Sequence, residues 1–295
     1  MKHLCTVSDK NFLLQGLALY DSLCETSEDF LLHFFFFDEE PIESIITLPS
    51  NSNIVFYNVS DIATDTDEFK QSQLLRSSEY RYYCWSLASY FTKYIMDKID
   101  KPVTYIDSDI YFHKPIDLLY EKFNNNDVGI FRHRQFNLSI NYIEGHYNVG
   151  VVYFNNSRAG KILLNWWADS VLYKKHPEYA TCGDQKYLEV FTQQKNVSVY
   201  ADHGIGHGAP WQWQLYDYSK YNDGKIIWNG EAQDLVFSHF SQFKYSLPDN
   251  QYIASTSHHC YTPMHYYNTW PLTDIYNRYF DRLKKSHETY IREHK

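Results

Sequence analysis

The sequence predicts an α/β protein with a mostly parallel central sheet flanked by helices, and three observations support this fold class. Apolar runs of strand length alternate along the chain with stretches of helical periodicity. The first three strand candidates are separated by helical segments, which is the order of a βαβ unit. One run, DFLLHFFFF at 29–37, is apolar on both faces, as expected of a parallel strand that helices cover on both sides.

The first half of the chain justifies this fold class element by element. Leu13, Leu17 and Leu23 recur at helical spacing after the first strand. Pro41 follows the second strand and can open a helix, and Pro102 breaks the chain before the next strand. The elements expected in order are strand His3–Val7, helix 11–23, strand 29–37, a helix after Pro41, strand Asn53–Val59, a polar loop with a helix start at 61–80, helix Tyr82–Met96 and strand 103–112.

The second half continues the alternation of strands and helices. The elements expected here are strands Val128–Arg132, 147–155, 197–202 and, as the last one, 235–240, with helices at Ala159–Tyr173, from 183 and from Thr273 onward. Polar or glycine-rich loops are expected at 133–146 and 203–233. The chain has no internal repeat and no low-complexity linker, so a single domain over 1–295 is expected.

Composition and charge limit the classes of function. The net charge of −9 argues against broad nucleic-acid binding through phosphate neutralisation, and it is compatible with a substrate whose charge a metal handles locally. Aromatic residues make up 18% of the chain, enough to supply both a core and a surface that stacks against a ligand. No signal peptide and no run of about 18 apolar residues is visible. The five cysteines are scattered without a CxxC pair, so reduced thiols in the cytoplasm are expected.

Two aspartates interrupt the strand expected at 103–112, in the stretch YIDSDIYF. On one strand Asp107 and Asp109 would share a face, because side chains two apart point the same way. Neighbouring carboxylates repel unless a cation or proton lies between them, and hard oxygen ligands suit Mg²⁺ or Mn²⁺. The alternative is that both are turn residues that end the strand and bind nearby backbone.

Five stretches, taken in order, resemble the GT-A glycosyltransferases, most of all the retaining family 8 type that includes bacterial lipopolysaccharide galactosyltransferases and glycogenin. The stretches are CTVSDKNF, YIDSDIYF, YNVGVVYFN, GDQKYL and VFSHFSQFK, and they cover most of residues 3–245. The resemblance implies a Rossmann-like GT-A fold with a C-terminal helical tail. It also implies transfer of a sugar from a nucleotide-diphosphate donor, a UDP-sugar in particular, to a glycan or lipid-linked acceptor with retention of configuration, as in polysaccharide biosynthesis.

The same resemblance implies roles for individual residues. Residues 1–112 would form a nucleotide-binding half, residues 113–260 a donor-sugar and acceptor half, and residues 270–295 the helical tail. The implied site consists of Asp9 and Asn11 for base and ribose, Asp107, Asp109 and His239 for Mn²⁺ or Mg²⁺, Asn148 near the donor sugar, Asp184 and Gln185 as catalytic candidates at the transferred sugar, and Lys244 for the diphosphate.

Alternatives and departures accompany these assignments. Helix capping is the alternative for Asp9, Asn11 and Asp184, and an ordinary strand start is the alternative for Asn148. The family pattern is H-x-x-G-x-x-K, whereas here Lys244 comes one residue early and no glycine intervenes. The family's basic residue on the helix before D-x-D has no match at its expected place, and Arg81 and Lys93 are the candidates to replace it.

The acceptor side is open to two interpretations. The aromatic residues of 203–218 could stack on sugar faces or simply cover the core; they are Trp211, Trp213, Tyr216 and Tyr218. The basic helical tail could rest on an anionic membrane, or it could be a solvated helix face, since acidic residues including Asp281, Glu288 and Glu293 are interspersed.

Two other classes of function remain as rivals. A nucleotidyltransferase that forms sugar nucleotides would open with a glycine-rich, basic phosphate loop, and VSDKNFLLQG lacks that character. A non-catalytic carbohydrate-binding protein would explain the aromatic content, but it has little need of two aspartates within a strand.

Overall fold

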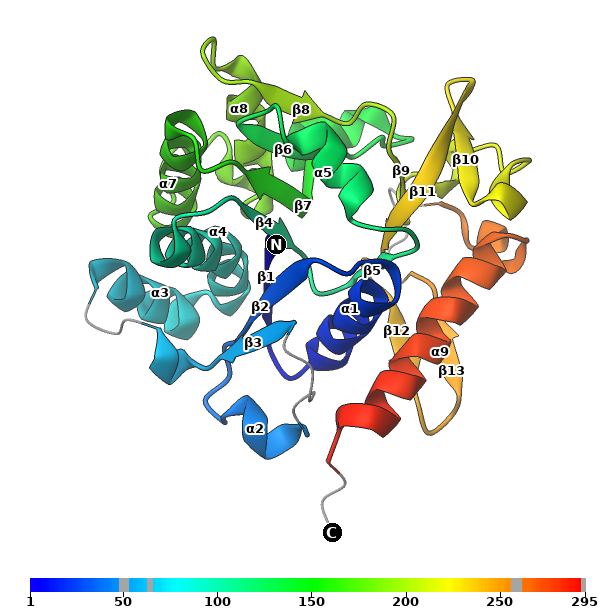
Figure 1. The fold of residues 1–295 in the computed structure, drawn as a ribbon, viewed down its shortest axis with the longest axis horizontal. Coiled ribbons are helices and arrows are strands. Elements are labelled where there is room, and N and C mark those ends of the chain that lie inside the picture. Colours follow the sequence, from blue (N-terminus) through cyan, green and yellow to red (C-terminus); the bar gives the residue numbers. More distant parts are fainter. Residues whose placement is uncertain (48–52, 63–65, 256–261, 293–295) are drawn as a thin grey trace.

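The computed structural model describes residues 1–47, 53–62, 66–255 and 262–292, and it contains the expected central sheet (Figure 1). Its strand order is β3-β2-β1-β4-β7-β6-β8, and only β7 runs against the other strands. The fold class predicted from the sequence is therefore confirmed. The strands are β1 (Lys2–Ser8), β2 (Phe30–Phe36), β3 (Ile54–Tyr57), β4 (Val103–Ile106), β6 (Val128–Arg132), β7 (Tyr147–Phe154) and β8 (Val199–Ala201).

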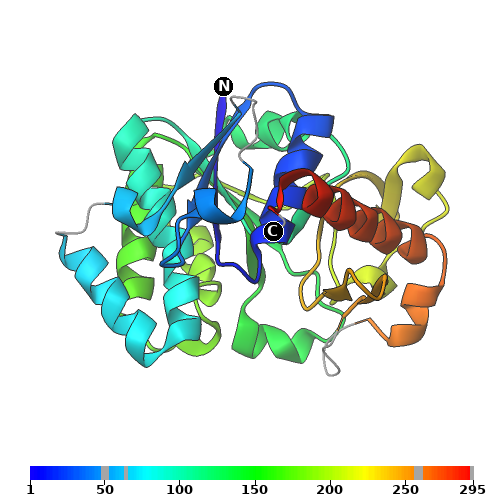
Figure 2. The same cartoon turned by 90° about the horizontal axis from the view of Figure 1, so that it is seen from below.

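Helices cover both faces of this sheet, which explains its doubly apolar strands. In Figure 2 the cyan helices of residues 67–99 and the green helix of residues 158–172 lie on one side of the sheet, and the blue and red helices lie on the other. Phe35 of β2 packs into the core on the first side, whereas Phe34 and Phe36 pack into the core on the second. The covering helices are α3 (Asp67–Ser78), α4 (Tyr80–Ile99) and α7 (Arg158–Leu172) on the first side, and α1 (Leu13–Thr26) and α5 (Asp117–Phe123) on the second.

Local sequence signals set the ends of these helices. The Ser157 hydroxyl caps α7 by accepting from the Gly160 backbone N at 3.1 Å. Helix α4 ends at Ile99, the next residue Asp100 adopts a left-handed conformation with φ of 51°, and Pro102 follows before β4. The chain thus enters β4, the strand that leads to the two aspartates, from a fixed helix end.

A smaller sheet and a C-terminal helix form a second layer beside the central sheet. Strand β11 pairs with β10 and β5 antiparallel and with β9 parallel, while β12 and β13 form a separate hairpin. Helix α9 lies alongside α1 and buries Tyr276 and Tyr279 in a third core (Figure 1). These elements are β5 (Ile110–Phe112), β9 (Gly206–Gly208), β10 (Lys225–Trp228), β11 (Glu231–His239), β12 (Lys244–Ser246), β13 (Gln251–Ile253) and α9 (Leu272–Tyr290), and the short helices are α2 (Ile42–Ile45), α6 (Asn141–Glu144) and α8 (Glu189–Gln193).

The prediction of one strand over 103–112 is wrong. Strand β4 ends at Ile106, and β5 begins at Ile110 and joins the other sheet. Residues 107–109 form a turn in which the Ile110 backbone N donates to the Asp107 carbonyl at 3.1 Å. The chain breaks here because β4 pairs with β1 and β7, whereas β5 pairs with β11. The strand pleat therefore does not bring the two carboxylates together.

Two further expectations need correction. The strand expected at 235–240 is the end of the longer strand β11, and it is not the last strand, since β12 and β13 follow. The helix expected from 183 begins with a 3-10 turn at Lys186–Leu188 and becomes α-helical only in α8. Of the five cysteines, Cys5, Cys24, Cys84 and Cys182 are free thiols, and Cys260 lies outside the described residues.

Candidate functional site

A pocket of about 590 Å³ opens where the two sheets meet. It lies at the carboxyl ends of β1 and β4, where open α/β sheets bind ligands. Because β7 runs the opposite way, its first residues reach the same edge of the sheet. The carboxyl end of β11 closes the pocket from the small sheet. Its lining therefore comes from segments that are far apart in sequence.

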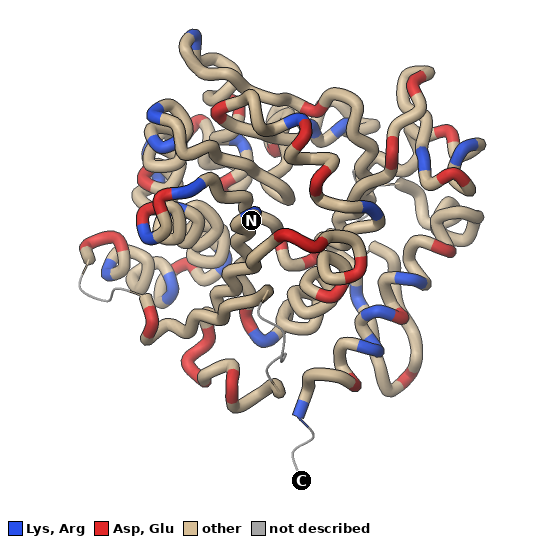
Figure 3. The backbone as a smooth tube through the Cα atoms, viewed as in Figure 1, with Lys and Arg blue, Asp and Glu red and all other residues tan. Residues whose placement is uncertain are grey.

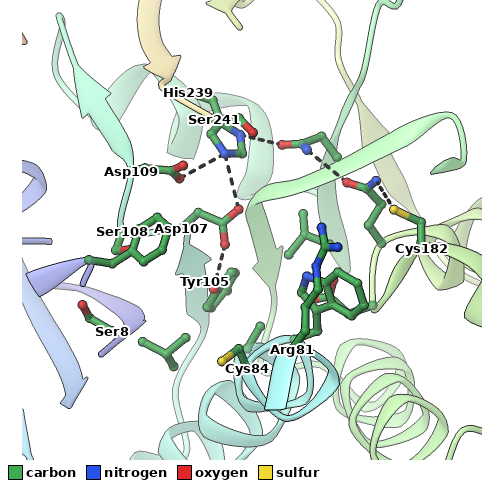
Figure 4. A pocket seen from close by; sticks show the side chains of 18 of the residues that line it. Ser8, Arg81, Cys84, Tyr105, Asp107, Ser108, Asp109, Cys182, His239 and Ser241 are labelled. Carbon is green, nitrogen blue, oxygen red and sulfur yellow. Dashed lines mark hydrogen bonds and ion pairs between the residues drawn. The ribbon is translucent and has the colours of Figure 1, made fainter. Parts of the chain in front are cut away.

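Three potential metal ligands meet in one corner of this pocket, here called the acidic corner: Asp107, Asp109 and His239 (Figure 4). His239 Nε2 lies 3.0 Å from Asp109 Oδ1 and 3.7 Å from Asp107 Oδ2. Backbone pairing produces this approach, because His239 pairs with Ile110 and the Phe240 backbone N donates to the Asp109 carbonyl at 2.9 Å. The convergence of two aspartates and one histidine agrees with the sequence prediction.

Burial and neighbouring charges shift the pKa values of Asp107 and His239 in the acidic corner. Burial raises the pKa of Asp107, and the nearby charge of Asp109 raises it further. His239 and the Tyr105 hydroxyl, which donates to Asp107 Oδ1 at 2.7 Å, lower this pKa, but their effects are outweighed. Burial favours the neutral form of His239, but the two carboxylates outweigh burial and raise its pKa. Two carboxylate oxygens and one imidazole nitrogen within 4.8 Å of one another form a donor set that fits Mn²⁺.

A wall of amide and carboxyl groups faces the same pocket and is here called the amide wall: Asn148, Asp184 and Gln185. Asn148 Nδ2 donates to Gln185 Oε1 at 3.1 Å, and Asn148 Oδ1 lies 3.1 Å from His239 Nδ1. The amide wall is therefore hydrogen-bonded directly to the acidic corner. The sequence resemblance implied that all three residues lie near the donor sugar, and the structure brings them to one pocket.

The backbone of the amide wall is held from behind. The Trp167 indole donates to the Asp184 carbonyl at 2.9 Å. Gly183 has φ of 57°, and a Cβ there would lie 2.4 Å from the Trp85 ring, so only glycine fits. Asp184 is buried, and burial, followed by the charge of Asp107, raises the pKa of its carboxyl group well above its usual value.

At the other end of the pocket, Asp9 and Asn11 follow β1 and line the cavity. Asp9 Oδ1 accepts from the backbone N of Asn11 at 2.9 Å and of Phe12 at 3.1 Å. Asp9 Oδ2 accepts from Asn11 Nδ2 at 2.9 Å and from the Tyr80 hydroxyl at 3.3 Å. Asp9 therefore holds the turn that precedes α1 but does not cap the helix, whose N-cap Phe12 has no side-chain cap, and Asp9 lines the pocket as well.

The basic residues considered from the sequence lie in different places. Lys244 is exposed at the start of β12 and is not among the residues that line the pocket. Lys93 pairs with Asp97 on α4, away from the pocket. Arg81 lines the pocket with its guanidinium 4.9 Å from the Trp85 ring centre. The role of Lys244 in gripping a diphosphate stays a prediction.

Sequence reasoning missed His133, which is buried and lines the pocket behind Gln185. Its Nε2 lies 3.2 Å from Gln185 Oε1, its Nδ1 lies 2.9 Å from the Gly145 carbonyl, and burial lowers its pKa to about 4. It sits just after β6 in a polar loop, where nothing in the sequence separates it from the other histidines. Only its position at the end of a predicted strand hinted at the pocket.

The aromatic residues of 203–218 divide between the two interpretations. Trp211 lines the pocket with its ring edge-on to His239, at 5.3 Å between centres. Trp213 and Tyr216 are buried, with the Trp213 indole donating to the Tyr276 hydroxyl and the Tyr216 hydroxyl donating to the His207 carbonyl. Packing against the core therefore accounts for these two residues.

The basic residues of α9 are interleaved with acidic ones, as Figure 3 shows. Arg278 pairs with Asp274, Arg282 with Glu25 of α1, and Lys284 with Asp281. Peripheral membrane contact through this helix stays a prediction. Among the described residues, no helix combines the length and the apolar character that crossing a membrane requires.

Comparison with known proteins supports the fold. No family model matches the chain. An uncharacterized protein of Bacillus subtilis (strain 168), YfnF, is 27% identical over 257 residues, which is 81% of each chain. The galactosyltransferase LgtC, solved with donor and acceptor sugar analogs, superposes with a TM-score of 0.55 at 12% identity over 96% of this chain and 95% of that one. The apo form of mouse xyloside xylosyltransferase 1 gives a TM-score of 0.52 at 17% identity over 81% and 97%. These likenesses confirm the GT-A fold.

Proposed function

We propose that this chain is a metal-dependent glycosyltransferase that moves a sugar from a nucleotide-diphosphate donor, a UDP-sugar in particular, to a glycan or lipid-linked acceptor. The observation that carries the proposal is the acidic corner hydrogen-bonded to the amide wall across one pocket. Two solved proteins with this fold are named as sugar transferases, and one of them was solved with donor and acceptor sugar analogs. Retention of configuration follows from the sequence resemblance.

The difficult part of this reaction is departure of a diphosphate with concentrated negative charge. Asp107, Asp109 and His239 would hold a divalent cation, Mn²⁺ or Mg²⁺, that supplies electrostatic stabilisation to the leaving group. Their side chains keep 28%, 13% and 9% of their surface exposed, so a ligand in the pocket can reach them. Arg81, as a lining cation, is a candidate to assist, together with Lys244 if its hairpin approaches the donor.

The remaining site residues divide the donor between them. Asp9 and Asn11, at the end of β1, would meet the base and ribose in the nucleotide-binding half of the chain, residues 1–112. Asp184 and Gln185, in the half formed by residues 113–260, would face the transferred sugar. A carboxyl and an amide there can bind sugar hydroxyls and steady the oxocarbenium character of the anomeric carbon. Trp211, which lines the pocket beside His239, offers an aromatic edge for the sugars.

A panel of sugar nucleotides, assayed with Mn²⁺, with Mg²⁺ and with chelator, tests the proposal. We expect metal-dependent binding and slow hydrolysis of at least one donor, and anomeric analysis of the product reports retention. Asp109→Asn should lower metal-dependent turnover more than about 100-fold. Asp97→Asn, at an exposed ion pair on α4, is the matched control and should leave turnover unchanged.

The same assay separates the rival functions. A nucleotidyltransferase would release pyrophosphate from a nucleoside triphosphate and a sugar phosphate. A carbohydrate-binding protein would bind glycans without cleaving any donor. If no sugar nucleotide is bound or cleaved with metal present, the glycosyltransferase proposal fails.

A further inference from the structure

We infer that Asn148 is a positioning residue that holds His239 and Gln185 in place. Its side chain joins the acidic corner to the amide wall through four interactions within the protein. The inference rests on the proposed function in one respect, since it treats His239 as a ligand of a divalent cation.

The orientation of the Asn148 amide follows from one backbone group. The Gly150 N–H can only donate, and it lies 2.8 Å from Asn148 Oδ1. The oxygen end of the amide therefore faces Gly150, and its second lone pair faces His239 Nδ1 at 3.1 Å. His239 must then carry a hydrogen on Nδ1, so in the neutral ring the lone pair of Nε2 faces the corner where Asp107 and Asp109 lie. That tautomer is the one a metal ligand needs when it binds through Nε2.

The nitrogen end of the same amide is also occupied. Asn148 Nδ2 donates to Gln185 Oε1 at 3.1 Å. Its other hydrogen faces His133 Nε2 at 3.4 Å, which can accept because His133 Nδ1 donates to the Gly145 carbonyl. The oxygen and the nitrogen of the Asn148 amide thus both have partners within the protein. Gln185 is held with its oxygen toward Asn148 and its nitrogen toward Cys182 Sγ at 3.5 Å.

Gly150 supplies an independent observation. A Cβ at this position would lie 2.6 Å from Asn148 Oδ1 and 2.8 Å from His239 Nδ1, on the hydrogen bond between them. The Gly150 carbonyl also accepts from the Asp107 backbone N at 2.9 Å. One peptide segment of β7 therefore fixes the aspartate turn directly and the histidine through Asn148. The absence of a side chain at 150 is required by the contact that we assign to positioning.

Mn²⁺ binding to the full chain, measured without any donor, tests the inference with three variants. Asn148→Leu should lower Mn²⁺ affinity by about 10–100-fold, the usual effect of losing a partner of a metal-bound histidine. Asn148→Asp keeps an acceptor for Gly150 and His239, so Mn²⁺ affinity should stay at or above that of the wild type. Asn155→Leu removes an amide just after the far end of β7, where Asn155 Nδ2 donates to the Asn126 carbonyl. This control should leave Mn²⁺ affinity unchanged.

Ring nitrogen shifts of His239 in NMR spectra give a readout that a purely structural role would not move. At a pH high enough to deprotonate the imidazolium, the Nδ1–H tautomer should dominate in the wild type and in Asn148→Asp, and it should be lost in Asn148→Leu. Wild-type Mn²⁺ affinity in Asn148→Leu would overturn the inference, as would an equal loss in Asn148→Asp. If Asn148→Leu does not fold, the comparison of Asn148→Asp with the wild type still decides.

The donor panel distinguishes failure of this inference from failure of the proposed function. Mn²⁺ affinity is measured without a donor, so it does not depend on whether the chain transfers a sugar. Wild-type Mn²⁺ affinity in Asn148→Leu, together with metal-dependent donor cleavage by the wild type, would therefore overturn the inference and leave the glycosyltransferase proposal standing. A wild type that binds no Mn²⁺ would instead remove the metal site on which both depend.

Discussion

Two clusters of carboxylate and histidine lie on β9, β11 and the segments that follow β4, β6 and β8, and they differ in whether they contain an arginine. In the first, called the buried triad, Arg134 donates to both oxygens of Asp202, at 2.7 and 2.5 Å, and His207 Nε2 lies 3.2 Å from the same carboxylate. The Arg134 and Asp202 side chains are fully buried, and the guanidinium stacks 3.9 Å from the Trp228 ring centre. The acidic corner has two carboxylates and a histidine but neither lysine nor arginine within its ion pairs.

The pKa shifts of the two clusters have opposite signs. Burial alone would raise the pKa of Asp202, but His207 and Arg134 outweigh it and the pKa is lowered. At Asp107 burial prevails over His239, and the pKa is raised. The buried triad thus contains its own cation and needs no ligand, whereas the acidic corner is open and would gain stability from a cation. Similar residues therefore serve packing in one place and, as we propose, binding in the other.

The largest expected effect is at the buried triad. Arg134→Met should cost about 3–5 kcal/mol in the free energy of unfolding, because it leaves Asp202 buried and unpaired. Urea unfolding measures this cost, with the exposed Arg158→Met as control. A cost below about 1 kcal/mol would mean that the triad does not hold the fold.

At the acidic corner the opposite response is expected. Asp109→Asn removes a repulsive charge, so the metal-free protein should unfold at the same or a higher temperature than the wild type. Saturating Mn²⁺ should stabilise the wild type by about 2.7 kcal/mol at a hundred times Kd, and chelator should reverse this. The variant should show no such gain in thermal unfolding. Equal stabilisation of both proteins would place the cation elsewhere.

A third histidine cluster, which contains no carboxylate, sharpens the comparison through pH. His33 is buried between His3 and Tyr57, at 3.1 and 3.2 Å, and burial lowers its pKa to about 4. Because the folded pKa lies below the unfolded value, this contribution to stability is complete above pH 6.5 and is lost as pH falls toward 4.

This contribution can be isolated with one variant. His33 should account for about 2 kcal/mol of the fall in unfolding free energy between pH 7 and pH 5. His33→Gln cannot titrate, so its stability should change less over this range than that of the wild type. Parallel pH profiles of the two proteins would show that His33 accepts a proton without cost in the fold.

The smallest effect is expected where an ion pair meets water. Glu25 pairs with Arg282 across α1 and α9, and its side chain is 46% exposed. Glu25→Gln should cost about 1 kcal/mol or less in urea unfolding, since water already solvates the carboxylate. A loss as large as that of Arg134→Met would mean that docking of α9 depends on this pair rather than on buried Tyr276 and Tyr279.

Most of the central sheet could be predicted from the sequence because each of its strands has a local apolar pattern. The run at 30–36 is apolar on both faces, and the structure covers both faces. The break after Ile106 had no local signal, because it depends on pairing of Ile110–Phe112 with β11, more than 120 residues later. The periodicity of apolar residues does not predict which distant strand a segment pairs with.

The site was predicted in the same uneven way. Asp107, Asp109 and His239 were found through motif order, and the structure brings them together. His133 was missed because its importance arises from burial against Gln185 and not from its neighbours in sequence. Lys244 was expected at the pocket, but the β12–β13 hairpin carries it to the surface.

The division of the acidic corner between two sheets has a mechanical consequence. Asp107 is tied to the central sheet through the Gly150 carbonyl, whereas His239 belongs to β11 of the small sheet. A cation coordinated by both residues would cross-link the two layers. Amide hydrogen exchange in β10 and β11 should then slow when Mn²⁺ is added, while exchange in β2 and β3 stays as it was.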